Sequence, residues 1–174
     1  MIAEAADFRA DLEWSHKCEE GDCWRQIYRQ AFPRMVAMHN HREDGQHQRA
    51  GIDRSVVLDN GKCVWVDEKS RRIADTGDIM LEWLSNDRSG APGWAVKPLL
   101  AHYIAYAFMP TGTAYLLPVE QMQGAWDRHG SAWREKYGDR RAINNGYSTV
   151  STPVPISVLY SAIGQMLRAS FEPL

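Results

Sequence analysis

Two acidic residues and a lysine in the first half of the chain are of the types that hold a divalent metal beside a reacting phosphate. Asp53 stands where one strand-like run begins, and Asp67 and Lys69 stand near the end of the next run. Carboxylate oxygens are ligands for Mg²⁺ and Mn²⁺, and such an ion acidifies a bound water and neutralises charge on phosphorus. A lysine beside the ion can orient that water or stabilise the crowded phosphate.

A β-hairpin is predicted to carry these residues. Strand-like runs at 52–58 and 62–70 flank the tripeptide Asp59-Asn60-Gly61, and Asn-Gly between β-branched runs is the strongest short-range signal for a hairpin. Because successive strand side chains alternate between faces, one face of this hairpin is apolar enough to pack under a helix. Its residues are Ile52, Val56, Leu58, Val64 and Val66.

The length of the turn decides whether the two acids and the lysine meet. A two-residue turn would place Asp53 opposite Glu68 and leave Asp67 and Lys69 on the other face. A three-residue turn, with Gly61 in the left-handed conformation, pairs Asp53 with Asp67 instead. Lys69 then shares their face, because alternate side chains point to the same side. We expect the three-residue turn, which gathers all three groups.

The arrangement resembles the PD-(D/E)XK nuclease superfamily, in the form found in phage and bacteria. Asp53 matches the isolated acidic position, and Asp67-Glu68-Lys69 matches the (D/E)-x-K triplet. The sequence departs from the pattern at Ile52, which stands where many members have proline. Many members add a glutamate from an upstream helix, and four acids compete for that position here: Glu19, Glu20, Glu43 and Asp44.

The resemblance covers residues 44–72 and implies a fold, a reaction and a cofactor. The implied fold is a restriction-endonuclease-like core of the α/β or α+β class, in which helices flank a mixed central β-sheet with the site at one edge. It would form a single domain over residues 1–174. The implied reaction is hydrolysis of DNA by water activated at Mg²⁺ or Mn²⁺. Asp53 and Asp67 would hold the ion, and Lys69 would activate or orient the water.

Four more residues are candidates for the same site. Gln48, just before the isolated acid, could contact substrate or a water, or form a strand-end hydrogen bond. Arg71 and Arg72 follow the triplet and could meet phosphate or lie at a solvated strand end. Glu82 stands inside a third strand, predicted at 79–84 next to the hairpin. It could be a further metal ligand or an edge residue facing water, and we favour the ligand.

Other readings of the same residues remain open. An acid facing a lysine on the next strand is often a surface ion pair that contributes about 0.2–1 kcal/mol. A second alternative is a catalytically inactive nuclease-fold protein that binds nucleic acid or a protein partner. A third is a phosphoesterase that acts on a small nucleotide. The basic stretch at 128–141 is either a solvated helix face or a phosphate contact.

Length, charge and cysteine content set the broad class. A chain of 174 residues can bury a sizeable core. A net charge of −2 argues against a strongly basic nucleic-acid binder, although local patches matter more to a nuclease than the total. The odd count of three cysteines favours a reducing compartment. We expect a cytoplasmic protein without membrane association; the sequence does not specify the oligomeric state, and a homodimer is one option.

The remaining pattern predicts helices and strands around the hairpin. The segment at 38–48 is predicted to be a polar loop that enters the site. Apolar runs at 103–109 and 113–119 predict a central pair of strands. The stretch at 148–155 is expected to be extended. Helical spacing predicts four helices, at 1–20, 23–31, 120–137 and 156–171.

Overall fold

The computed structural model describes residues 22–174 of the chain. Within this part the chain forms ten strands in two sheets, with four α-helices and one short 3-10 helix. The expected class, a mixed α/β or α+β fold, is confirmed. The helix predicted at 1–20 lies outside the described residues, and so do the candidate acids Glu19 and Glu20.

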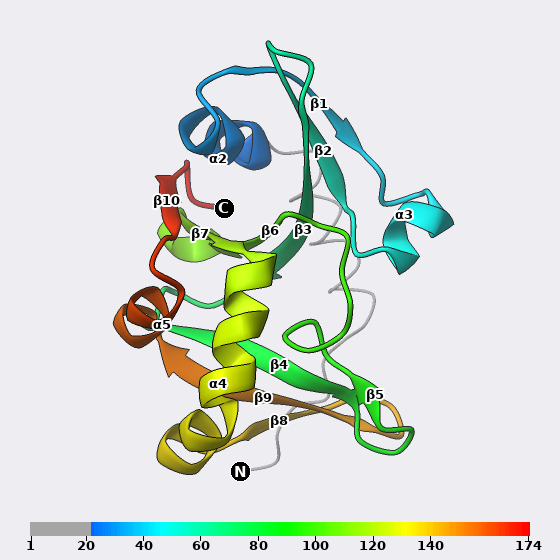
Figure 1. Cartoon of the computed structure of the whole chain (residues 1–174), viewed down its shortest axis with the longest axis vertical. Coiled ribbons are helices and arrows are strands. Elements are labelled where there is room, and N and C mark those ends of the chain that lie inside the picture. Colours follow the sequence, from blue (N-terminus) through cyan, green and yellow to red (C-terminus); the bar gives the residue numbers. More distant parts are fainter. Residues whose placement is uncertain (1–21) are drawn as a thin grey trace.

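A six-stranded mixed sheet carries the predicted hairpin (Figure 1). Its strands lie in the order β1-β2-β3-β6-β7-β10. Only β3 and β6 run parallel, and the other neighbours are antiparallel. The bounds are β1 Met35–Asn40, β2 Arg54–Leu58, β3 Cys63–Arg71, β6 Tyr103–Phe108, β7 Thr113–Pro118 and β10 Leu167–Ser170.

The strand predicted at 79–84 belongs to a second, antiparallel sheet. The sequence predicts this strand next to the hairpin, where the structure does not have it. That strand is β4 (Asp78–Asn86), and it pairs with β5 (Ala91–Pro92) and β9 (Ser148–Pro155). The remaining strand, β8 (Arg140–Ile143), pairs with β9. The prediction of one sheet was wrong here because β4 finds its long partner β9 about seventy residues later in the chain, which no local pattern specifies.

The helices lie around the two sheets as Figure 1 shows, with α4 running in front of β4 and β9. Their bounds are α2 Cys23–Ala31, α3 Gly45–Arg49, α4 Val119–Tyr137 and α5 Ile156–Ile163. The helices predicted at 23–31 and 120–137 are confirmed, and α4 ends at Gly138 with φ +70° as its cap. No helix of the described part is long and apolar enough to cross a membrane.

The hairpin between β2 and β3 has the expected three-residue turn. The N–H of Leu58 donates to the carbonyl of Lys62 at 2.9 Å, and Gly61 has φ +78°. Glycine alone takes this conformation without a steric cost from Cβ. Ser55 therefore pairs with Trp65, as the predicted register requires.

The six-stranded sheet separates two cores. On one face α2 packs Trp24, Ile27 and Tyr28 onto Val56 and Val66, as the apolar face of the hairpin predicted. Burial of each such large apolar side chain contributes about 1.5–3 kcal/mol. The other face packs against the second sheet, α4 and α5, and this larger core includes Ile79, Leu81, Ile104, Tyr106, Phe108, Leu117, Met122 and Trp126.

Two segments differ from the sequence-based expectation. The polar loop predicted at 38–48 contains the end of edge strand β1 and then α3, because the free edge of β2 accepts a further strand. The helix predicted at 156–171 ends at Ile163, where Gly164 has φ +76°. The chain then pairs as β10 with β7, which satisfies backbone groups that would otherwise form an open sheet edge.

Candidate metal-dependent active site

The hairpin brings Asp53, Asp67 and Lys69 close together. Asp53 lies just before β2, where its N–H donates to the carbonyl of Val66 at 2.9 Å, and its charge is near enough to Asp67 to raise the pKa of that acid. Lys69 Nζ donates to Asp67 Oδ1 at 2.7 Å. The group lies on inner strands, since β1 adds outside β2 and β6 adds beside β3. The expected position at one edge of the sheet was therefore wrong.

Two hydrogen bonds hold the Asp53 carboxylate in one orientation. Gln48 Nε2, at the end of α3, donates to Oδ1 at 2.9 Å, and the backbone N–H of Glu68 donates to Oδ2 at 2.7 Å. Burial alone would raise the pKa of Asp53. The Glu68 hydrogen bond, the charge of Arg42 and the Gln48 hydrogen bond outweigh burial, so the pKa lies below its ordinary value. Asp53 is an anion at neutral pH.

The surroundings of Asp67 shift its pKa in the opposite direction, above its ordinary value. Burial raises the pKa of Asp67 to about 6, because the cation of Lys69 does not offset the combined effect of burial and the Asp53 anion. The two carboxyls lie within hydrogen-bonding reach of one another. A pair of acids whose environments push their pKa values apart is a common feature of catalytic sites, and a divalent cation would stabilise both acids as anions.

A Mg²⁺-type ion fits the donor set of two carboxylates, since this ion commonly takes one or two carboxylates and completes its shell with water. Over residues 22–174, no group of three or more histidine, cysteine or acidic side chains lies close enough to hold a metal. Glu82 is thus not part of a three-carboxylate cluster with Asp53 and Asp67. A metal here would rest on the hairpin acids alone, among the described residues.

Glu82, Arg71 and Arg72 instead line a cavity of about 520 Å³ beside Lys69. The cavity lies where β3 and β6 of the first sheet meet β4 and β9 of the second, as its lining residues show. Burial raises the pKa of Glu82, and the nearby charge of Lys69 opposes that rise without cancelling it. Glu82, Arg71 and Arg72 therefore lie at the cavity next to Lys69 and are not part of the pair formed by Asp53 and Asp67.

A buried ionic network behind the site was not predicted. The side chain of Glu68 is 0% exposed and points away from the paired acids toward α2. Its Oε1 accepts from the Tyr28 hydroxyl at 2.6 Å and from Arg54 Nε at 2.6 Å. Its Oε2 accepts from Arg42 Nη2 at 3.3 Å. The sequence did hold a signal, because Arg54 interrupts an alternating apolar face and so requires a buried anion.

The segment predicted as a polar loop does reach the site. The N–H of His41 donates to the carbonyl of Asp53 at 2.8 Å, and His41 Nε2 lies 2.6 Å from Ser55 Oγ. The rings of His41 and His47 stack with centroids 4.1 Å apart. Burial lowers the pKa of His41. This segment therefore supports Asp53 through its backbone and through Gln48.

The basic stretch at 128–141 is occupied with contacts to its own surroundings. Arg134 Nη2 lies 3.0 Å from Asp139 Oδ2, and its guanidinium covers the ring of Trp83 at 3.8 Å. Arg141 Nη1 lies 2.9 Å from Asp87 Oδ2. These arginines are ion-paired on the surface and do not line the cavity beside Lys69.

Comparisons of the chain with known protein families, with curated proteins and with solved structures give no significant match.

Proposed function

We propose that this protein is a metal-dependent nuclease that hydrolyses phosphodiester bonds of DNA. One observation supports the proposal: two buried acids, Asp53 and Asp67, lie near one another, and Lys69 Nζ donates to Asp67 at 2.7 Å. A surface ion pair does not account for this group, because the two acids are buried and Asp53 is oriented by two hydrogen bonds. The resemblance to the PD-(D/E)XK superfamily supports the same reading.

Each residue has a distinct part in the proposed reaction. When bound, the divalent cation supplies an acidified water and neutralises phosphate charge. Asp53 and Asp67 hold that cation, and the Gln48 and Glu68 hydrogen bonds keep Asp53 oriented for it. Lys69 orients the attacking water in line with the leaving oxygen. Catalysis then comes mainly from positioning and charge stabilisation.

Cleavage of defined DNA substrates tests the proposal. Purified protein is incubated with linear, nicked and branched DNA in Mg²⁺, in Mn²⁺ and in chelator. We expect cleavage with the metals and none with chelator. Asp53→Asn and Lys69→Ala should each reduce the rate at least a hundredfold.

Two exposed residues on α4 provide matched controls, namely Asp127→Asn and Lys136→Ala. Each makes the same chemical change away from the site and should keep the full rate. If DNA binds but is not cleaved with any metal, the nuclease proposal fails and the inactive DNA-binding alternative replaces it. Cleavage that survives in both Asp53→Asn and Lys69→Ala would show that the activity comes from elsewhere.

A further inference from the structure

The cavity beside Lys69 has the charge that a phosphate group requires. Among the described residues that line it, Arg42, Lys69, Arg71 and Arg72 are cationic. Two acids, Glu68 and Glu82, also line it, so the four cations exceed the acids by two. Glu68 is paired with Arg42 and with the buried Arg54, and Lys69 is paired with Asp67. The balance of charge in the cavity is therefore positive, which favours a phosphate.

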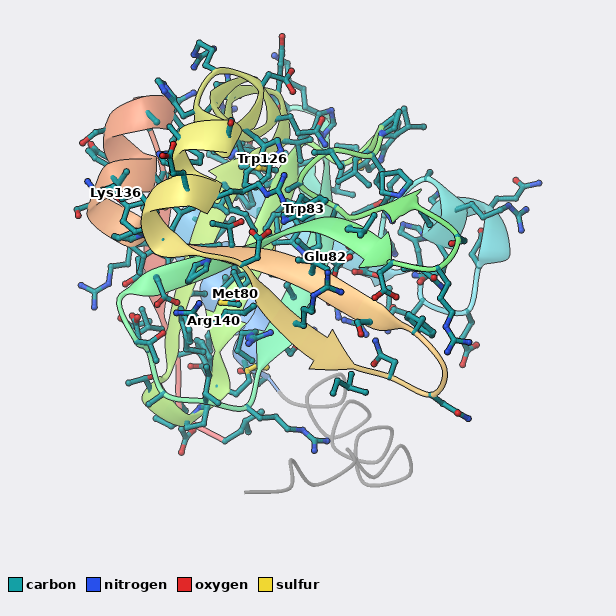
Figure 2. The ribbon with its side chains drawn as sticks, turned by 90° about the horizontal axis from the view of Figure 1, so that it is seen from below. Met80, Glu82, Trp83, Trp126, Lys136 and Arg140 are labelled. Atoms are coloured by element: carbon teal, nitrogen blue, oxygen red, sulfur yellow. The ribbon has the colours of Figure 1, made fainter. Side chains whose placement is uncertain are left out.

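Another part of the lining suits a nucleobase. Ile73 and Met80 contribute apolar side chains, and the largely buried rings of Trp94 and Tyr106 form the wall behind them. Figure 2 shows Met80 and Glu82 two positions apart on β4, and both line the cavity. The volume of about 520 Å³ falls within the range of pockets that take one small ligand. A cationic part next to an apolar part matches a single nucleotide.

A base can enter such a cavity only when it is unpaired. In a duplex each base is stacked and paired, so occupation of a pocket requires a single strand, an end, or a base turned out of the helix. Arg71 lies with its guanidinium 5.9 Å from the ring centre of Tyr106, which links the cationic and aromatic parts of the lining. Lys69 belongs both to this lining and to the paired acids.

We infer that the cavity is a subsite for one unpaired nucleotide of the DNA strand, with a phosphate at Arg71 and Arg72 and the base against Met80 and Trp94. The inference rests on the proposed nuclease function where it concerns cleavage, and it names the substrate class. DNA with a single-stranded nucleotide at the cleavage position is the substrate, and blunt duplex is not.

Binding in chelator tests the subsite apart from catalysis. Fluorescence anisotropy is measured with a labelled eight-nucleotide oligothymidylate and with a blunt duplex of equal length. We expect the single strand to bind at least tenfold more tightly. In the Arg71→Gln/Arg72→Gln variant this preference should disappear. The slope of log affinity against log salt should fall by about 0.7, since one single-strand phosphate contact is lost. Arg29→Gln, an exposed change on α2, should leave both values as in the wild type.

Filling the cavity gives a test that does not change charge. Ser151 of β9 lines the cavity, and Ser151→Phe should weaken oligothymidylate binding at least tenfold. Ser157→Phe, on the exposed side of α5, adds the same ring elsewhere and should have no effect. Circular dichroism and the melting temperature verify that both variants are folded. Wild-type binding in a folded Ser151→Phe protein would overturn the inference.

Asp53→Asn separates this inference from the proposed function, because Asp53 does not line the cavity. If Asp53→Asn keeps the single-strand preference and the wild type cleaves nothing, the subsite stands and the nuclease proposal fails. If the wild type cleaves blunt duplex as fast as overhanging DNA, with equal affinity for both, the subsite inference fails and the nuclease proposal stands.

Discussion

At the level of single residues, the two acids of the site differ because their surroundings differ. Asp53 accepts hydrogen bonds from Gln48 and from the backbone of Glu68, and its pKa is lowered. Asp67 is buried with Lys69 as its cationic partner, and its pKa rises to about 6. The residue types were readable in the sequence. Their protonation was not, because it depends on burial and on donors that only the folded chain supplies.

Replacing Asp67 should stabilise the metal-free protein above pH 6. The folded pKa of about 6 exceeds the ordinary unfolded value near 3.9. Wild-type stability from this group is therefore full below about pH 4 and is lost as pH rises through 6. Asp67→Asn removes that loss, so its free energy of unfolding at pH 7.5 should exceed that of the wild type by about 2 kcal/mol. Urea denaturation in chelator from pH 4 to 8 measures this, and a constant difference would contradict it.

Gln48 should matter to metal binding although it is not a ligand. Removal of its hydrogen bond frees Asp53 Oδ1 to rotate, and loss of a hydrogen bond that orients a metal ligand commonly costs about 10–100-fold in affinity or activity. We expect Gln48→Ala to weaken Mn²⁺ binding by about tenfold in calorimetry. Gln46→Ala, on the same helix and exposed, should bind Mn²⁺ as the wild type does. Equal affinities in the two variants would assign Gln48 to a purely structural hydrogen bond.

At the level of elements, β3 carries different chemistry on its two faces. Asp67 and Lys69 bond to each other, and Lys69 lines the cavity, whereas the carboxylate of Glu68 accepts from Tyr28 of α2. Alternation along the strand and the turn at Gly61 made this division predictable. The partners of Glu68 were not predictable in this way, since Tyr28 precedes it by 40 residues and reaches it only through the packing of α2.

Removing one member of the Glu68 network should strongly destabilise the protein. Glu68→Ala would leave the guanidinium of Arg54 buried without its anion, and unpairing of this kind costs about 3–5 kcal/mol. Chemical denaturation measures the loss. The double change Arg54→Met with Glu68→Leu should recover part of it, because the fully buried ion pair is removed as a whole, although Tyr28 and Arg42 lose their acceptor. A double variant as unstable as Glu68→Ala would show that the network does more than compensate charge.

At the level of the whole molecule, the chain leaves β3, builds β4 and β5 of the second sheet, and returns to form β6 beside β3. This route places the second sheet next to Lys69 and encloses the cavity between the two sheets. Within the second sheet, Asp139 accepts from Trp83 Nε1 of β4 and from Thr152 Oγ1 of β9, and so ties these two strands to the end of α4. Figure 2 shows Trp83 near Trp126 of α4, which packs against the same sheet.

The C-terminal strand should be essential to the fold. Removal of residues 165–174 deletes β10, takes Ala169 and Phe171 out of the core under α2, and exposes the edge of β7. An exposed edge strand promotes self-association. We expect the truncated protein to melt about 4–16 °C lower, as a loss of about 2–4 kcal/mol would produce in a chain of this size. It should also form oligomers in size-exclusion chromatography. Deletion of Leu174 alone, which is 53% exposed, is the control, and a monomeric truncation with unchanged melting would contradict the expectation.

The sequence by itself determined the hairpin, its three-residue turn and its register, because a glycine-bearing turn fixes pairing between residues close in the chain. The buried partners of Glu68, the second sheet and the cavity beside Lys69 were decided by tertiary structure. These features join segments that lie tens of residues apart, and their pairing depends on which sheet edges and faces are left free once the local elements have formed.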